Sequence, residues 1–306
     1  MKKIIFVLVA ASMTMAAHAK ILRVSNVKGS SAPYTSINTA INAAEDGDTI
    51  MVDASTTQYE SISPVVINKR VVLLGPGYWL QENGIIQEGG SQATVYSMNI
   101  SAKGAVVKGM TIFYQDGISI SSPQVVINRC RLVRGFITIA DNANNCIIHQ
   151  NYCRAVNGNA SSNHQITNNI IAGSEFDATM SIQGVTDSYI AFNTFIGAVP
   201  KQMDDSYWGA RNCTIEKNVF KGIPTVHSSS HYGDNYVPEP WNYDATMTDK
   251  EVLAVAPNLT YGAFAGDDPY ILSGVPAGPV IQDMIVPTTV EKGSKMSVTI
   301  KVGVVK

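Results

Sequence analysis

Acidic and basic residues that could perform chemistry gather in two segments in the middle of the chain. The first contains Glu175 and Asp177, and the second, residues 198–211, contains Lys201, Asp204, Asp205, Tyr207, Trp208 and Arg211. A pair of carboxyl groups can act as acid and base in glycoside hydrolysis, and clustered carboxylates can bind Ca²⁺. A lyase would instead use Lys201 or Arg154 as a base beside a metal-neutralised uronate. The candidate catalytic residues are therefore Glu175, Asp177, Lys201, Asp204 and Asp205, with Ca²⁺ as the possible cofactor and no metal ligands assigned.

Aromatic side chains form a second group of candidates. Each of the three Trp residues has a Tyr within two positions. An exposed Tyr or Trp presents a flat apolar face with a polar tip, which suits stacking on a sugar ring. The candidate carbohydrate-binding residues are Tyr78, Trp79, Arg154, Tyr207, Trp208 and Arg211. The alternative for each is an ordinary role, either in a solvent-facing turn or in packing against an end of the fold.

An internal repeat sets the elements that must position these residues. An aliphatic residue is followed by Asn three positions later, by an apolar residue at five and by Gly at seven. Full copies are Ile166-Asn169-Ile171-Gly173, Ile190-Asn193-Phe195-Gly197 and Ile215-Asn218-Phe220-Gly222, and partial copies begin at Val107, Ile127 and Ile148. The leading positions are separated by 20, 21, 18, 24 and 25 residues.

This period is too short for a pair of packed helices and fits one turn of a chain that coils as three short strands. Successive coils then lie about 4.8 Å apart, and the leading aliphatic residues stack in one column inside. We expect the recurring Asn at a bend, bonded to the Asn of the next coil as a ladder, and the recurring Gly at a positive φ. His149 and Glu216 share a column three coils apart, so we expect no direct contact between them.

The first residues after position 20 predict a cap on this coil. Ile37, Ala40, Ile41 and Ala44 have helical spacing, and strands are expected at 49–52, 65–67 and 71–74. Together with Tyr34-Thr35-Ser36, Gly47-Asp48, Asn68-Lys69 and Gly75, these residues resemble the opening of pectin-lyase-like β-helix proteins. The resemblance continues through the repeats to about Gly222. The tail motifs Gly262-Ala263-Phe264 and Asp267-Asp268-Pro269-Tyr270 resemble the ending of secreted bacterial β-helix proteins without an assigned activity.

The resemblance implies an all-β fold, a right-handed parallel β-helix with an N-terminal capping helix and a C-terminal capping tail. We expect the β-helix over residues 20–260 and the cap over 261–306. Residues 223–260 are expected to wrap the last coils, and strands near 280–286 and 297–302 are expected to close the far end, because a solenoid needs caps.

The resemblance implies a reaction far less clearly, since this fold hosts lyases, hydrolases, isomerases, adhesins and inert scaffolds. Its enzymes work in a groove along one long face beside the loops, which here points to the variable segments after each repeat Gly. Polygalacturonases resemble one another through Asn-Thr-Asp, Gly-His-Gly and Arg-Ile-Lys segments, and classical pectate lyases through a Trp-Ile-Asp-His run. None of these segments is present.

The first 19 residues have the three parts of a secretory signal peptide. Lys2 and Lys3 precede the apolar run 4–11, and Ala17-His18-Ala19 is a cleavage site of the A-x-A type. The run is shorter than the roughly 20 apolar residues that span a bilayer. We therefore expect an exported protein, periplasmic, on the cell surface or extracellular, without a membrane span.

The net charge limits the classes of partner that the chain can bind. The net charge is −2, and only 15% of residues are charged, so no basic field predicts nucleic acid as a partner. We expect a monomer whose partner is a polysaccharide.

The four cysteines are Cys130, Cys146, Cys153 and Cys213. Export permits disulfides, but a chain of this length can bury enough surface to be stable without them. We therefore favour cysteines that stack in the core over cysteines that form disulfide bonds.

Three functions follow for the chain. The first is recognition of a polysaccharide or other glycan without catalysis, by loops 154–177 and 198–211. The second is a polysaccharide lyase or glycoside hydrolase that uses the carboxylates and basic residues there. The third is a structural or adhesive surface protein. Convergent charge near Trp208 would favour the second, an aromatic strip without titratable groups the first, and uniformly polar faces the third.

Overall fold

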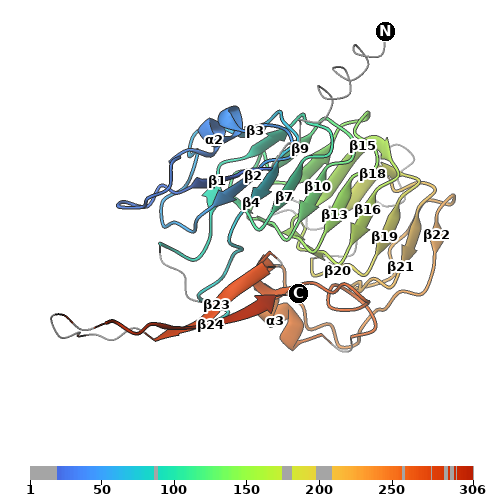
Figure 1. The fold of residues 1–306 in the computed structure, drawn as a ribbon. Coiled ribbons are helices and arrows are strands. Elements are labelled where there is room, and N and C mark those ends of the chain that lie inside the picture. Colours follow the sequence, from blue (N-terminus) through green and yellow to red (C-terminus); the bar gives the residue numbers. More distant parts are fainter. Residues whose placement is uncertain are drawn as a thin grey trace, which may run out of the picture.

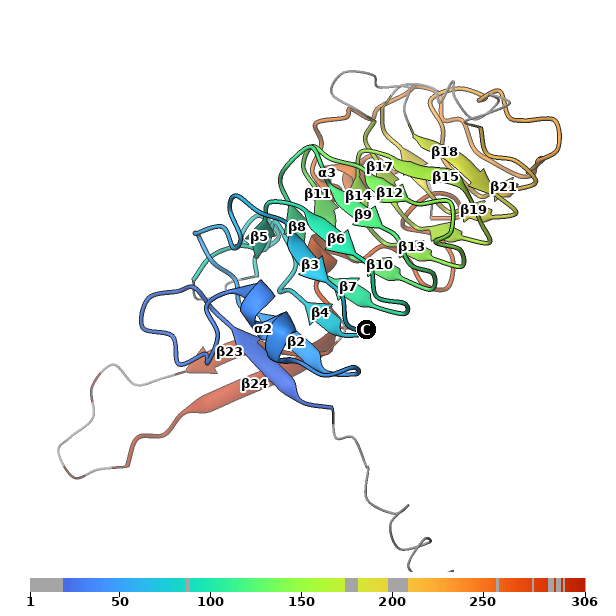
Figure 2. The ribbon, with the colours of Figure 1, turned by 90° about the horizontal axis from the view of Figure 1, so that it is seen from above.

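The computed structural model describes residues 19–85, 89–173, 181–197, 209–256, 259–276, 278–285, 289, 293 and 295–305. In these residues the chain coils as a parallel β-solenoid whose strands form three sheets along the molecule (Figures 1 and 2). The expected all-β fold with parallel coils is confirmed. No helix among the described residues has both the length and the apolar character needed to cross a membrane.

The strands form three sheets, named A, B and C, and the central coils contribute one strand to each of them. Sheet A is ten-stranded and consists, in order, of β1 (Ile21–Val24), β2 (Thr49–Val52), β4 (Val72–Leu74), β7 (Val106–Lys108), β10 (Val126–Asn128), β13 (Ile147–His149), β16 (Gln165–Thr167), β19 (Tyr189–Ala191), β21 (Thr214–Glu216) and β22 (His231–Tyr232). Sheet B consists of β5 (Thr94–Val95), β8 (Thr111–Ile112), β11 (Arg131–Leu132), β14 (Tyr152–Cys153), β17 (Ile170–Ile171) and β20 (Thr194–Phe195). Sheet C consists of β3 (Val65–Ile67), β6 (Met98–Ile100), β9 (Ile118–Ile120), β12 (Ile137–Ile139), β15 (Val156–Ser162) and β18 (Ile182–Thr186).

The apolar column predicted from the repeat runs through sheet A. Ile166 pairs with Ile190, and Ile190 with Ile215, in parallel register. The column continues backward through Ile148, Ile127 and Val107, and all six side chains are fully buried. Residues alternate between the two faces of each strand, so the three-residue strands β4, β7, β10, β13, β16, β19 and β21 each place their central residue in the core, and the longer β1 and β2 place two.

An asparagine ladder lies at the bend between sheets A and B. Asn193 Oδ1 accepts hydrogen bonds from the backbone N–H and the Nδ2 of Asn169, at 3.0 and 2.9 Å. Asn193 Nδ2 donates to Ile166 O and to Asn218 Oδ1 of the next coil, at 2.8 and 3.0 Å. Equivalent bonds join Asn151 to Asn169 and Asn218 to Asn235. The predicted ladder is confirmed, and Asn235 extends it beyond the repeat visible in the sequence.

The residue before each ladder position adopts a left-handed backbone. These residues are Gly109, Arg129, Gln150, Asn168, Phe192 and Lys217, with φ between 54° and 65°. A left-handed non-glycine residue costs roughly 1–2 kcal/mol, which the ladder hydrogen bonds offset. The expectation for the recurring glycine holds only at Gly173, with φ 77°, because Gly197 and Gly222 have no positive φ. The tight turn of the A–B bend therefore lies at the residue before the ladder position and not at the recurring glycine.

A second bend, between sheets C and A, repeats this design. Its left-handed residues are Gly104, Gln124, Asn145, Asn163, Asp187 and Asn212. Buried side chains follow them, including Cys146, His164 and Cys213. All four cysteines of the chain are buried and free, so core stacking is confirmed over disulfide pairing. Burial raises the pKa of the Cys130 and Cys153 thiols to about 12, which keeps them protonated and unreactive.

The predicted capping helix is α2 (Ile37–Ala43). Ser36 begins it, and its hydroxyl accepts a hydrogen bond from Thr39 N at 3.3 Å. Ile37, Ala40 and Ile41 are buried and belong to the solenoid core. The helix therefore covers the first coils with its apolar face, as the helical spacing predicts.

The tail differs from expectation. After β22 the chain forms α3 (Asp249–Ala254) and then runs back along the solenoid to the short 3₁₀ helix η1 (Leu272–Gly274) (Figure 1). Pro276 and Ser273 pack against Gly109 and Gly77, where an added Cβ would lie 2.9 Å from Pro276 Cγ and 2.4 Å from Ser273 O. The strands β23 (Gly278–Ile285) and β24 (Thr299–Val305) form an antiparallel hairpin. The hairpin thus begins beside the early coils, and the prediction that these strands close the far end is wrong.

The returning tail covers the outer side of sheet B. A second apolar cluster joins Tyr152, Ile170 and Val219 of the solenoid to Val252 and Tyr270 of the tail. Both faces of most sheet B strands are therefore buried. This burial explains why the sequence of these strands lacks an alternation of apolar and polar residues.

We expect Asn193→Ala to lower the free energy of unfolding by about 2–4 kcal/mol, because it leaves buried donors and acceptors of the ladder unpaired. The measurement is urea denaturation followed by circular dichroism. The matched control is Asn99→Ala, since Asn99 is exposed on sheet C. Equal destabilisation by the two variants would show that the ladder adds nothing beyond a surface amide.

We expect stability to fall as the pH drops from about 6.5 towards 4, because burial lowers the pKa of His164 to about 4. Its Nδ1 accepts a hydrogen bond from Cys146 N at 3.1 Å, which an imidazolium cannot do. The unfolded chain binds the proton first, so the loss is on the order of 3 kcal/mol across this window. Unfolding free energies at pH 7, 6 and 5 test this, and His164→Gln should flatten the slope. An unchanged slope in that variant would refute the assignment.

Candidate functional site

Most of the residues predicted from the sequence to be catalytic or sugar-binding fall outside the described parts of the chain. These are Glu175, Asp177, Lys201, Asp204, Asp205, Tyr207 and Trp208. Their two segments follow β17 and β20 in the chain, where it passes from sheet B towards sheet C. We call this side of the solenoid the B–C corner. The described residues Arg154, Arg211, Tyr78 and Trp79 have definite places.

Arg154 lies at the B–C corner. Its Nε donates to Val133 O at 2.9 Å and its Nη1 to Gly173 O at 3.4 Å, so the guanidinium bridges the coils before and after its own. Arg211 is half-buried and lies beside sheet C, where its backbone forms a bridge with Thr186. Arg154 is therefore at the B–C corner, whereas Arg211 lies at the end of sheet C, where the chain enters the C–A bend.

Tyr78 and Trp79 lie instead under the tail. Tyr78 is fully buried, and its hydroxyl is hydrogen-bonded to that of Tyr270. Trp79 is half-buried, stands edge-on to Tyr152 with ring centroids 5.0 Å apart, and has the Arg131 guanidinium 4.1 Å from its ring centroid. The proposal of Tyr78 as a sugar-stacking residue does not fit this position, because the tail leaves no face of its ring open.

A group of aromatic residues that the sequence analysis missed occupies the B–C corner in the earlier coils. Tyr96 and Tyr114 stack with ring centroids 4.1 Å apart. Phe113 is 41% exposed, and the exposed Arg134 guanidinium lies 5.4 Å from the Phe113 ring centroid. The hydrogen bond that the Tyr96 hydroxyl donates to Tyr114, together with desolvation, raises the pKa of Tyr96 to about 12, so the Tyr96 hydroxyl remains neutral. We call Tyr96, Phe113, Tyr114 and Arg134 the aromatic edge.

The positions of these residues within the repeat could have identified the aromatic edge from the sequence. Each member comes one or two residues after a sheet B strand, β5, β8 or β11. Arg154 holds the equivalent place after β14, and the segments that contain Glu175 and Trp208 follow β17 and β20. An alignment of the coil sequences on their sheet B strands therefore places the aromatic edge, Arg154 and the two candidate segments at one position of the repeat. A search for pairs of acidic residues finds only the two segments.

The outward face of sheet C, beside this edge, begins with an exposed valine and is otherwise polar and uncharged along its paired column. Its paired positions run Val66, Asn99, Ser119, Thr138, Asn157 and Gln183. Near the last of them, three buried oxygens lack a hydrogen-bond partner: Asn157 Oδ1, Ser181 Oγ and Gln183 Oε1. These three oxygens have almost no solvent exposure, so the polar groups that the face presents to a ligand are those of the exposed Asn99 and Ser119 and the half-exposed Thr138.

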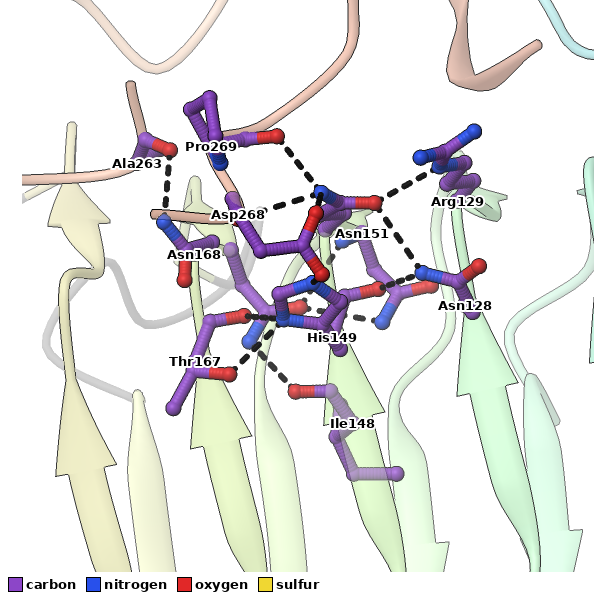
Figure 3. A network of polar contacts seen from close by, with 12 residues as sticks. Asn128, Arg129, Ile148, His149, Asn151, Thr167, Asn168, Ala263, Asp268 and Pro269 are labelled. Atoms are coloured by element: carbon purple, nitrogen blue, oxygen red, sulfur yellow. Dashed lines mark hydrogen bonds and ion pairs between the residues drawn. The ribbon is translucent and has the colours of Figure 1, made fainter. Parts of the chain in front are cut away.

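A different network holds the tail against sheet A. Residues 262–275 form a strap, and the left-handed residues of the A–B bend bind it (Figure 3). Asn168 Nδ2 donates to Ala263 O and Ala265 O at 3.1 and 2.8 Å, and Gln150 Nε2 donates to Asp268 Oδ1 and Pro269 O at 2.8 and 2.6 Å. The same bends that carry the ladder inside thus hold the strap outside.

Two titratable residues that share a column do not meet, and the described residues show no metal-binding cluster. His149 and Glu216 occupy one column three coils apart, as expected, and Glu216 accepts a hydrogen bond from Tyr189. Among the described residues, no three His, Cys, Asp or Glu side chains are grouped so that they could hold a metal ion. The carboxylates considered for Ca²⁺ lie outside that part of the chain.

Comparison of the chain with protein-family models, curated proteins and solved structures gives no match. The parallel β-solenoid is therefore established by the strand pairing alone, and the function has to be inferred from the surfaces described above.

Proposed function

We propose that this protein is exported and recognises a polysaccharide along the B–C corner and the adjoining face of sheet C. The observation that carries the proposal is the aromatic edge: Tyr96, Phe113, Tyr114 and Arg134 on three successive coils. Rings with a flat apolar face and a polar tip suit sugars, which have apolar faces and hydroxyl rims. A linear ligand that lies parallel to the solenoid axis meets one such group about every 4.8 Å.

The face of sheet C supports the same ligand. Sugar hydroxyls can hydrogen-bond to the exposed side chains of Asn99 and Ser119 and to the half-exposed Thr138, whereas a cationic protein surface would find no carboxylates in the paired column there. Arg134 and Arg154 add positive charge at the corner, which suits uronic acids. Membership of the pectin-lyase-like superfamily, implied by the opening residues and the repeats, is part of this proposal.

Recognition without catalysis is favoured over hydrolysis or lysis because the described residues of the corner include aromatic rings and guanidinium groups but no pair of carboxylates. A lyase or hydrolase would use Glu175, Asp177, Lys201, Asp204 and Asp205, and these segments adjoin the same corner in the chain. An enzymatic role would therefore place its groove in the same region.

We expect Tyr114→Ala to weaken retention on the preferred polysaccharide about tenfold or more, because it removes a stacking ring, a loss of about 1.4 kcal/mol or greater. The measurement is affinity electrophoresis or calorimetry on a panel of acidic and neutral polysaccharides. Tyr189→Ala is the matched control, since Tyr189 is an exposed tyrosine on sheet A. Absorbance of unsaturated uronates or new reducing ends in the same incubations would reveal a lyase or a hydrolase. The proposal fails if the parent binds no glycan or if Tyr114→Ala binds as the parent does.

A further inference from the structure

A pocket of about 270 Å³ lies between the outward face of sheet A and the strap, away from the B–C corner. Lys108, Asn128 and His149 line it from one column of three successive strands. Arg129 and Asp268 complete its polar wall, and the half-exposed Val126 and Ile147 line it as well. Figure 3 shows Arg129, Asn128, His149 and Asp268 around this space.

Arg129 is a buried cation without a carboxylate partner. Its side chain is only 6% exposed. Nε donates to Gln150 Oε1 at 2.7 Å and Nη1 to Val275 O at 2.8 Å, both neutral oxygens. Burial lowers the pKa of the guanidinium, although an arginine stays charged at any physiological pH. A buried charge with only neutral partners is costly, and an anion in the pocket would offset that cost.

Asp268 does not fill this role. Its Oδ2 accepts a hydrogen bond from His149 Nε2 at 3.0 Å, and its Oδ1 accepts from Gln150 at 2.8 Å. Its charge attracts Arg129 only at longer range. Both carboxylate oxygens of Asp268 are thus used in hydrogen bonds that attach the strap to the solenoid. Within the described part of the chain, the side of the pocket lined by Arg129 and Lys108 has no anion of its own.

His149 is neutral in this arrangement. Burial lowers its pKa, and its two nitrogens have complementary partners in the neutral form. Nε2–H donates to Asp268 Oδ2 at 3.0 Å, and Nδ1 lies 2.8 Å from the Thr167 hydroxyl, from which the neutral ring accepts, and 3.1 Å from Thr167 O. The pocket therefore holds two fixed cations, Lys108 and Arg129, against one anion, Asp268, an excess of one positive charge.

We propose that this pocket binds a small organic carboxylate. One negative charge balances the excess cation, with the carboxylate between Lys108 and Arg129 and the amide of Asn128 beside it. Val126 and Ile147 give the carbon skeleton an apolar surface, which a bare inorganic anion would not use. This site lies on another face than the proposed polysaccharide site and does not depend on it.

The test is calorimetric titration of the full chain with glucuronate, with glucose as its uncharged twin and inorganic phosphate as the competing anion. We expect saturable binding of glucuronate that weakens as ionic strength rises, no binding of glucose, and weaker binding of phosphate. Phosphate binding as tight as or tighter than glucuronate binding would overturn the assignment to a carboxylate.

Lys108→Met should weaken glucuronate binding about tenfold or more, since it removes a charged donor. Lys108→Arg should largely restore binding, and Lys28→Met, which removes an exposed lysine elsewhere, should leave it unchanged. Arg129→Gln should also weaken binding. If this variant fails to fold because it loses the hydrogen bond to Val275 of the strap, the Lys108→Met variant still tests the site. Absence of glucuronate binding, or equal binding by Lys108→Met and Lys28→Met, would refute the site. Tyr114→Ala separates the two proposals, because it should affect polysaccharide retention and not glucuronate.

Discussion

The structure depends on one recurring constraint, the sharp bend between sheets A and B. Six successive coils make this turn with a single left-handed residue, and five of the six residues are not glycine. In four of these coils the next residue is an asparagine whose amide bonds to neighbouring coils, and after Arg129 the backbone N–H of Cys130 donates to the first of them, Asn151. Each amide is satisfied only if its neighbours are in register, so the ladder also fixes the pairing of the strands. Stacked aliphatic columns supply most of the burial, and the ladder specifies how they align.

The same bend organises the outside of the solenoid. A left-handed residue projects its side chain away from the core, and in successive coils Arg129, Gln150 and Asn168 do so in one row. The strap fastens to this row. The strap and α3 then cover sheet B, and the two proposed binding surfaces lie elsewhere: on sheet A beside the strap and at the B–C corner with sheet C.

These two surfaces differ in chemistry. The B–C corner has stacked rings and guanidinium groups on successive coils beside an uncharged polar face, an arrangement suited to a long neutral or acidic chain. The pocket beside the strap is small, has one excess cation and contains a buried arginine without a counter-ion. A repeated surface follows from a repeated fold, whereas the pocket exists only because a non-repetitive segment lies across the coils.

The sequence by itself determined the repeat, the parallel coils, the buried isoleucine column, the asparagine ladder and the capping helix, because each depends on local spacing that stacking merely multiplies. It also favoured a place in the core for the four cysteines over disulfide pairing, and the structure confirmed this. The path of the tail, the burial of Tyr78 and the pairing of Asp268 with His149 were decided only by the tertiary structure. These contacts join residues more than 100 positions apart, and no local pattern encodes which face of a solenoid a returning segment will cover. The aromatic edge lies between these cases: its residues are visible in the sequence, but only the strand register places Tyr96 on Tyr114.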